Sequence, residues 1–131
     1  MEIKQNEATK NRPEGTRAID ATTVFTNLVD VSRQLRKEKA WETNDLNGIT
    51  VFKTDRMTAV LTLIRERTTL KKIMVNGLFT ILVLDGKLIV DTDDGSYTLE
   101  TANMLNLHPN KSHSITAKKE TLLLQITSNV D

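Results

Sequence analysis

The sequence contains no cysteine, and this absence excludes two classes of site at once. A disulfide framework and a metal site with thiolate ligands both require cysteine side chains. Internal repeats and low-complexity tracts are absent as well. With 131 residues, 38% of them hydrophobic, the chain has the length and composition of one modest globular domain.

The chain also lacks an excess of charge and a long apolar run. Eighteen Lys and Arg residues oppose seventeen Asp and Glu residues, which leaves a formal net charge of +1. A protein that neutralises many phosphates needs a basic face, so no nucleic-acid partner is expected. No signal-peptide pattern opens the chain, and no apolar run approaches the roughly 20 residues of a membrane span. The expected compartment is therefore the cytoplasm, with no membrane partner.

Residues 1–20 carry few apolar side chains. So polar a segment buries too little surface to offset the entropy of ordering, and a flexible N-terminal arm is expected. The alternative is a segment that lies along a partner subunit, anchored by Ile3 and Ile19. The single domain is expected to occupy residues 21–131.

An amphipathic helix is expected at about residues 24–39. Thr22 or Thr23 would supply its N-cap hydroxyl, and Trp41 would pack it against the rest of the domain. At helical spacing, one face comprises Phe25, Leu28, Val29, Ser32 and Leu35.

From Gly48 onward, short segments rich in β-branched and apolar residues alternate with turn formers, and this predicts strands. The segments are GITVFKT, MTAVLTLI, GLFTILVL, GKLIVDT, SYTLE, MLNLH, HSITA and TLLLQIT. An all-β sandwich or barrel over about residues 41–128 is expected. Asp85-Gly86 predicts a tight two-residue hairpin, and Asp93-Asp94-Gly95-Ser96 predicts a slightly longer one.

The usual signatures of catalytic and metal sites are missing. The acidic stretch DTDDGS does not fit a calcium loop, because Ser96 and Ala102 occupy the places of the required Gly and Glu. A Gly-rich phosphate loop, a Gly-x-Ser-x-Gly elbow and a His-Glu-x-x-His helix are also absent. The acids of DTDDGS are therefore assigned to a hairpin turn.

About the last eighty residues resemble a small single-domain cupin. The resemblance is carried by TTLKKIMVNGLFTILVLDGKLIV and by ETANMLNLHPNKSHSITAKKETLLLQIT, which includes a PxxxHS element before an apolar strand. It implies a jelly roll, or double-stranded β-helix, whose two sheets enclose a pocket, with the N-terminal helix preceding the barrel. It also implies a homodimer.

The metal-binding motif of that family is degenerate in this sequence. Aligned on Gly86, the two histidines and the glutamate of the family's first motif fall on Ile73, Val75 and Phe79. In the second motif, His113 matches the metal ligand, and Ala117 stands at the asparagine position. Because hydrocarbon side chains donate no lone pair, no metal and no other cofactor is expected.

The positions that would hold a metal describe a largely apolar pocket instead. If Ile73 and Val75 point inward, strand alternation also directs Phe79, Ile81 and Val83 inward, and Ala117 closes the facing strand. The predicted pocket consists of Ile73, Val75, Phe79, Ile81, Val83, His113 and Ile115. This lining suits a small apolar or aromatic ligand with one polar group, and it equally suits a filled core in which His113 is hydrogen-bonded to Ser114 or a backbone carbonyl.

Two functions follow from these observations. The first is a non-enzymatic module that binds a small molecule or has a structural or sensory role. The second is a cupin enzyme, an isomerase or a dioxygenase-like protein, that uses His113 with partners the sequence does not identify. Glu66 and Asp55 are the carboxylates considered for that role, and no catalytic residue is assigned. The apolar residues at the three ligand positions favour the first function.

Overall fold

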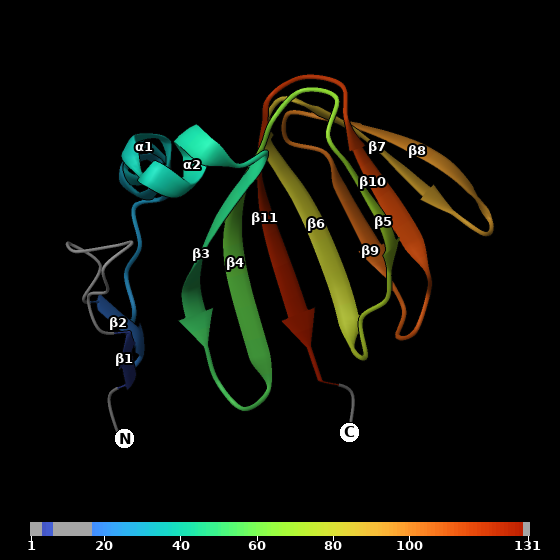
Figure 1. Cartoon of the computed structure of the whole chain (residues 1–131). Helices are drawn as coiled ribbons and strands as arrows, with labels where there is room; N and C mark the ends of the chain where they lie inside the picture. Colours follow the sequence, from blue (N-terminus) through green and yellow to red (C-terminus); the bar gives the residue numbers. More distant parts are fainter. Residues whose placement is uncertain (1–3, 7–16, 130–131) are drawn as a thin grey trace.

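The computed structural model describes residues 4–6 and 17–129 of the chain. Two antiparallel sheets face each other and form most of this region (Figure 1). The larger sheet has the strand order β3-β4-β11-β6-β9, with β3 at Leu46–Lys53, β4 at Met57–Ile64, β11 at Thr121–Ser128, β6 at Leu78–Asp85 and β9 at Met104–Leu107. The smaller sheet has the order β5-β10-β7-β8, with β5 at Thr69–Ile73, β10 at His113–Ala117, β7 at Lys87–Thr92 and β8 at Gly95–Glu100.

The chain crosses repeatedly between the two sheets. It runs from β4 to β5, back to β6, across to β7 and β8, and then through β9 and β10 to β11. All the pairings are antiparallel. This crossing between facing sheets is the connectivity of a jelly roll and confirms the predicted fold class. Each predicted strand segment is present.

The core between the sheets consists of side chains from alternate strand positions. On β6, Phe79, Ile81 and Val83 point inward, and they meet Ile115 and Ala117 of β10. The cluster is completed by Ile64, Leu88, Val90, Leu99 and Leu123. Because this strand alternation buries one face of each sheet against the other, burial of apolar surface holds the sheets together.

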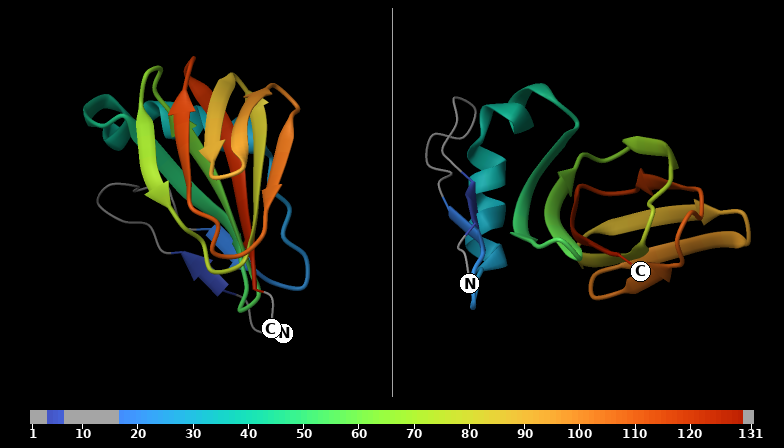
Figure 2. Two further views of the ribbon diagram at one scale, coloured as in Figure 1. Left: turned by 90° about the vertical axis from the view of Figure 1, so that its right-hand side faces the viewer. Right: turned by 90° about the horizontal axis from the view of Figure 1, so that it is seen from below.

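A second core lies on the outer face of the larger sheet, where two helices cover β3 and β4 (Figure 2). Helix α1 spans Leu28–Lys37, and the short helix α2 spans Lys39–Thr43. Trp41 is buried in this cluster, as expected. The Arg65 guanidinium lies 4.0 Å from its ring centroid, and Arg65 also donates to the Trp41 carbonyl. A cation is attracted to the face of an indole ring, so the contact between Arg65 and Trp41 helps to hold α2 against the barrel.

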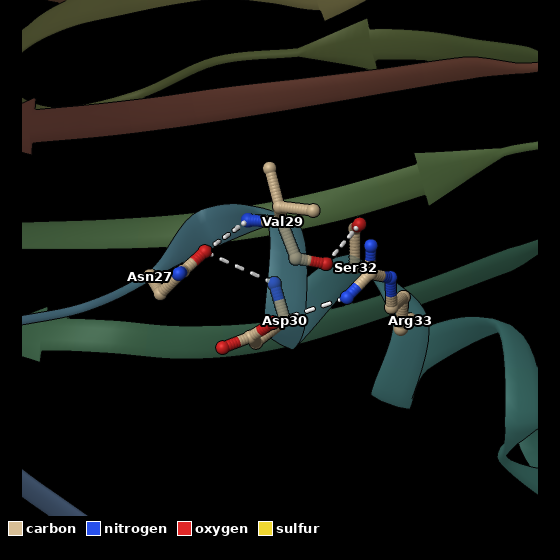
Figure 3. A network of polar contacts seen from close by, with 5 residues as sticks. All are labelled: Asn27, Val29, Asp30, Ser32 and Arg33. Atoms are coloured by element: carbon tan, nitrogen blue, oxygen red, sulfur yellow. Dashed lines mark hydrogen bonds and ion pairs between the residues drawn. The ribbon is translucent and has the colours of Figure 1, made fainter.

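The N-terminus of α1 differs from the expectation. The helix begins at Leu28 rather than near residue 24, and its cap is Asn27 instead of Thr22 or Thr23. Asn27 Oδ1 accepts the backbone N–H groups of Val29 at 3.0 Å and Asp30 at 3.2 Å (Figure 3). The Asn27 amide accepts backbone N–H groups that the first helical turn leaves unpaired. This cap stabilises a helix that begins at Leu28, after the two threonines.

The apolar face predicted for this helix is also partly wrong. Leu35 and Ser32 are buried against the sheet, but Phe25 is 88% exposed and Val29 58% exposed. Phe25 precedes the cap, so its side chain does not follow the helical spacing that placed it with Leu35. Within the described residues, no helix is long and apolar enough to cross a membrane.

The predicted hairpin at Asp85-Gly86 is wrong. β6 and β7 belong to different sheets, so these residues form a corner at which the chain changes sheet. Gly86 has φ 125°, and a Cβ there would lie 2.7 Å from the Glu120 carbonyl oxygen. Close approach of a neighbouring backbone, rather than a tight hairpin, explains the glycine. The second predicted hairpin is present, but its loop is shorter than expected: Thr92 pairs with Gly95 and Asp91 with Ser96, so only Asp93 and Asp94 form the turn.

One strand, β5, was not predicted. Its sequence TLKKI has two lysines at its centre, and the alternation of apolar residues is broken. A bulge against β10 accounts for the irregularity, because His113 pairs with Ile73 whereas Ile115 pairs with Leu70. Lys72 takes a positive φ of 55° in this bulge, and both Leu70 and Ile73 pack against the core.

Most of the predicted flexible arm lies outside the described residues. Two parts are described, and they pair as an antiparallel ribbon of β1 at Lys4–Asn6 and β2 at Arg17–Asp20. β2 lies near β3, and Ile19 is buried there. Flexibility of the remaining residues stays a prediction.

Candidate functional site

The pocket residues predicted from the sequence are brought together at the core between the sheets. Phe79, Ile81, Val83, His113 and Ile115 are all buried. Ile73 and Val75 are half-buried and pack against the same cluster. The inward orientation inferred from strand alternation is therefore correct, whereas the role of these residues as a ligand pocket stays a prediction.

The group divides into two parts along the barrel. Ile81, Val83 and Ile115 have no exposed surface, so this part is filled by its own side chains. The other part, which we call the His113 end, consists of Ile73, Val75, Phe79, Leu107 and His113. Ile73 pairs with His113 and Leu107 with Phe79, which places the four residues at one end of the barrel. Its residues Ile73, Val75 and Leu107 are half-buried, so this part of the group is closer to solvent.

His113 begins β10 and is only 3% exposed. Its ring packs against Phe79, with the centroids 5.4 Å apart and the planes tilted by 33°. Nδ1 lies 3.2 Å from the Lys111 carbonyl oxygen, so a backbone carbonyl, not Ser114, is its partner. Since a carbonyl oxygen only accepts, Nδ1 carries the hydrogen in the neutral ring. Nε2 is then left as an acceptor.

Nε2 of His113 has no hydrogen-bond partner in the part of the chain that the structure describes. Neither Glu66 nor Asp55 forms a hydrogen bond with Nε2, so the carboxylates named for an enzyme do not pair with it. Buried nitrogen atoms without a partner are uncommon in folded proteins, because the lost contact with water is not replaced. Nε2 is thus the polar atom that sets the chemistry of the His113 end.

The loop before β10 fixes the direction of this ring. The backbone N–H of Asn110 donates to the Val75 carbonyl oxygen at 2.9 Å, which joins the loop to the end of the β5–β6 connection. Asn110 has φ 62°, a left-handed conformation that asparagine tolerates. His108, the other histidine of HPNKSH, is exposed. The loop therefore directs one histidine into the barrel and leaves the other in solvent.

A first-row metal does not fit the residues around His113. Such an ion needs three or four nitrogen or oxygen ligands at about 2.0–2.2 Å, and the facing side chains of Ile73, Val75 and Phe79 supply none. Over residues 4–6 and 17–129, no three His, Asp or Glu side chains gather in a way that would hold a metal ion. What the His113 end offers is one nitrogen acceptor surrounded by hydrocarbon.

The sequence did not single out three polar residues on the inner face of the larger sheet. They are Thr62 of β4 and Gln125 and Thr127 of β11, which share the face of the core residue Leu123. The alternation of Leu123, Gln125 and Thr127 in TLLLQIT was the available signal. It was misleading because Leu122, Leu124 and Ile126 make the opposite face the more apolar one, and that face packs under the helices.

Comparisons with known proteins agree with the architecture. No family model matches the sequence, and no curated protein does either. Among solved structures, a cupin superfamily protein from Desulfitobacterium hafniense is 23% identical with a TM-score of 0.63, over 66% of this chain and 80% of that one. A cupin-2 domain protein from Shewanella frigidimarina is 14% identical with a TM-score of 0.62, over 79% and 94%.

KdgF from a Halomonas species is 15% identical, with a TM-score of 0.60 over 66% of this chain and 82% of that one. At these identities the similarity concerns the fold. The strand order, the crossings between sheets and these structures lead to one conclusion: the chain has the fold of a small cupin jelly roll, preceded by a short helix.

Proposed function

We propose that this protein binds a small, mainly apolar or aromatic molecule at the His113 end of its barrel, without a metal ion. The observation that carries the proposal is the buried Nε2 of His113, which has no partner among the described residues. An unsatisfied buried acceptor costs about 1–3 kcal/mol. A ligand that donates a hydrogen bond to Nε2 removes this cost, whereas none of the described residues does.

The surroundings of Nε2 favour an apolar body on that ligand. The Phe79 ring packs against the imidazole with the planes tilted by 33°, and Ile73, Val75 and Leu107 are half-buried in the same cluster. Ligand sites typically combine hydrophobic walls with a few polar groups that set orientation. Because Nε2 is covered in this structure, binding requires a half-buried neighbour to move aside. Rotation of an aliphatic side chain suffices for such a movement.

A thermal-shift screen of small aromatic and aliphatic compounds tests the proposal. A ligand that binds only the folded state raises the melting temperature in proportion to the logarithm of its concentration over Kd. The stabilising effect should weaken strongly in Phe79→Leu, which removes the ring that faces His113. Phe25→Leu is the matched control, because Phe25 is 88% exposed. A stabiliser that acts equally on both variants would place the site elsewhere, and a screen without any stabiliser would reject the proposal.

A further inference from the structure

The inner face of the larger sheet carries a row of polar side chains beside the His113 end. We call Thr62, Gln125 and Thr127 the threonine–glutamine row. Thr62 is buried, whereas Gln125 and Thr127 are only half-buried although they face the other sheet. In a sandwich filled throughout, such positions are apolar and fully buried. Solvent therefore reaches the inner face at this row.

Gln125 has a donor to offer there. Its Oε1 accepts the hydroxyl of Thr62 at 2.9 Å, which fixes the orientation of the amide. The side-chain Nε2 carries two hydrogens, and it donates to none of the residues that the structure describes. Gln125 thus supplies unpaired donors, whereas His113 supplies an unpaired acceptor.

Phe79 lies between these two groups. Thr127 is the cross-strand partner of Phe79, and Gln125 is the partner of Ile81, one inward position further along. Diagonal neighbours in an antiparallel pair are about 7–8 Å apart. On the other side, the ring of His113 is 5.4 Å from that of Phe79. The acceptor and the donors therefore flank one aromatic ring, at a separation that a single small molecule spans.

The charge of the inner face restricts the ligand further. Among the described inward positions around Phe79, none carries Asp, Glu, Lys or Arg. These positions carry Thr58, Val60, Thr62, Gln125, Thr127, Ile73, Thr92 and His113. Lys53, the partner of Thr58, is exposed at the end of β3. A carboxylate taken from water into such surroundings loses its hydration without gaining a countercharge. A neutral ligand avoids this penalty.

From this geometry we infer the class of ligand: a neutral, planar molecule with an O–H or N–H group at one end and a carbonyl oxygen at the other. Its donor pairs with Nε2 of His113, its carbonyl accepts from Nε2 of Gln125, and its flat body packs on Phe79. The inference rests on the proposed function and adds the polarity, the charge and the orientation of the ligand.

The experiment compares four probes of similar size by nitrogen-15 NMR of the histidine rings and side-chain amides. Since the chain has two histidines, the imidazole spectrum separates His113 from His108 without ambiguity. The probes are para-hydroxyacetophenone, para-methoxyacetophenone without the donor, para-ethylphenol without the carbonyl, and the acid para-hydroxybenzoate. The first should shift Nε2 of His113 and bind about five- to tenfold more tightly than each of the others, which is the usual effect of one hydrogen bond.

Gln125→Leu should remove the advantage of para-hydroxyacetophenone over para-ethylphenol and leave its advantage over the methoxy compound. Asn106→Leu is the matched control, because Asn106 also accepts a threonine hydroxyl, at 2.6 Å, on the outer face of the same sheet. Equal binding of all four probes at His113, or preference for the acid, would overturn this inference and leave the proposed function standing. No shift of His113 with any probe at millimolar concentration would reject both.

Discussion

The rings of His113 and Phe79 lie 5.4 Å apart, with their planes tilted by 33°. In the metal-binding pattern that the sequence resembles, these two positions hold ligands of one ion. Here the phenyl ring leaves the imidazole without a second ligand, and Nδ1 is turned toward the Lys111 carbonyl. The pair therefore forms a contact between an aromatic ring and a nitrogen acceptor, and the proposed binding site rests on this contact.

The stability of His113 variants tests whether its Nε2 is unpaired. Because leucine fills the space without burying an unsatisfied nitrogen, His113→Leu should lie within about 1 kcal/mol of the parent in urea unfolding. His113→Ala leaves a cavity and should cost about 2–3 kcal/mol. His108→Leu is the control, and its exposed site predicts a change within about 0.5 kcal/mol. A loss in His113→Leu as large as that in His113→Ala would contradict this expectation.

Gly86 should be intolerant of substitution. Its φ of 125° is unfavourable for other residues, and an added Cβ would collide with Glu120 and Thr121 at the crossing between sheets. Gly86→Ala is expected to lower the free energy of unfolding by about 2–4 kcal/mol. Gly48→Ala is the control, since its Cβ would meet Thr62 at an ordinary 3.4 Å and should change stability by less than about 1 kcal/mol. Similar effects of both substitutions would contradict the assigned corner.

Asn27 should be the residue that caps α1. Removal of its amide leaves the N–H groups of Val29 and Asp30 without their partner, so Asn27→Ala should cost about 1 kcal/mol. Thr23→Ala should have an effect within about 0.5 kcal/mol, because Thr23 precedes the helix and is exposed. Thermal unfolding followed by circular dichroism measures both. A larger loss in Thr23→Ala would show that the helix begins earlier.

Metal titration tests the interpretation of the degenerate motif. Purified without chelator and titrated with Fe(II), Mn(II), Ni(II) and Zn(II) by calorimetry, the protein should show no stoichiometric binding. One imidazole among hydrocarbon side chains is too small a ligand set for tight binding. One equivalent of metal that is lost in His113→Ala would overturn this interpretation.

The sequence predicted much of the barrel, since alternating apolar residues identify strands wherever one face is buried. It failed where contacts distant in sequence determine the structure. At Asp85-Gly86 the dipeptide is typical of a hairpin, yet the chain changes sheet there because Thr121 and Glu120 pack against the glycine. In β5, a bulge interrupts the alternation and two exposed lysines conceal a strand whose partner lies about forty residues later.

The candidate site was predicted in part for a related reason. The alternation of side chains along β6 correctly placed Phe79 between the two sheets, because buried residues alternate there with exposed or half-buried ones. Along β11, alternation groups Gln125 and Thr127 opposite the apolar Leu122, Leu124 and Ile126, which is the pattern of a solvent-facing side, so it did not place Gln125 between the sheets. The sequence likewise contains no information on the hydrogen bond between Thr62 and Gln125, since the two residues are 63 positions apart. That bond occupies Oε1 of Gln125 and leaves its amide N–H groups to donate elsewhere.

The most direct test of the central claim is the nitrogen-15 spectrum of the two imidazole rings, recorded with and without one equivalent of Zn(II) at a pH where both rings are neutral. We expect His113 to be the Nδ1–H tautomer, with an unpaired Nε2 whose signal zinc does not move, whereas the exposed His108 serves as the internal reference. An Nε2–H tautomer at His113, or a shift of its Nε2 signal that saturates at one equivalent of zinc, would contradict the account.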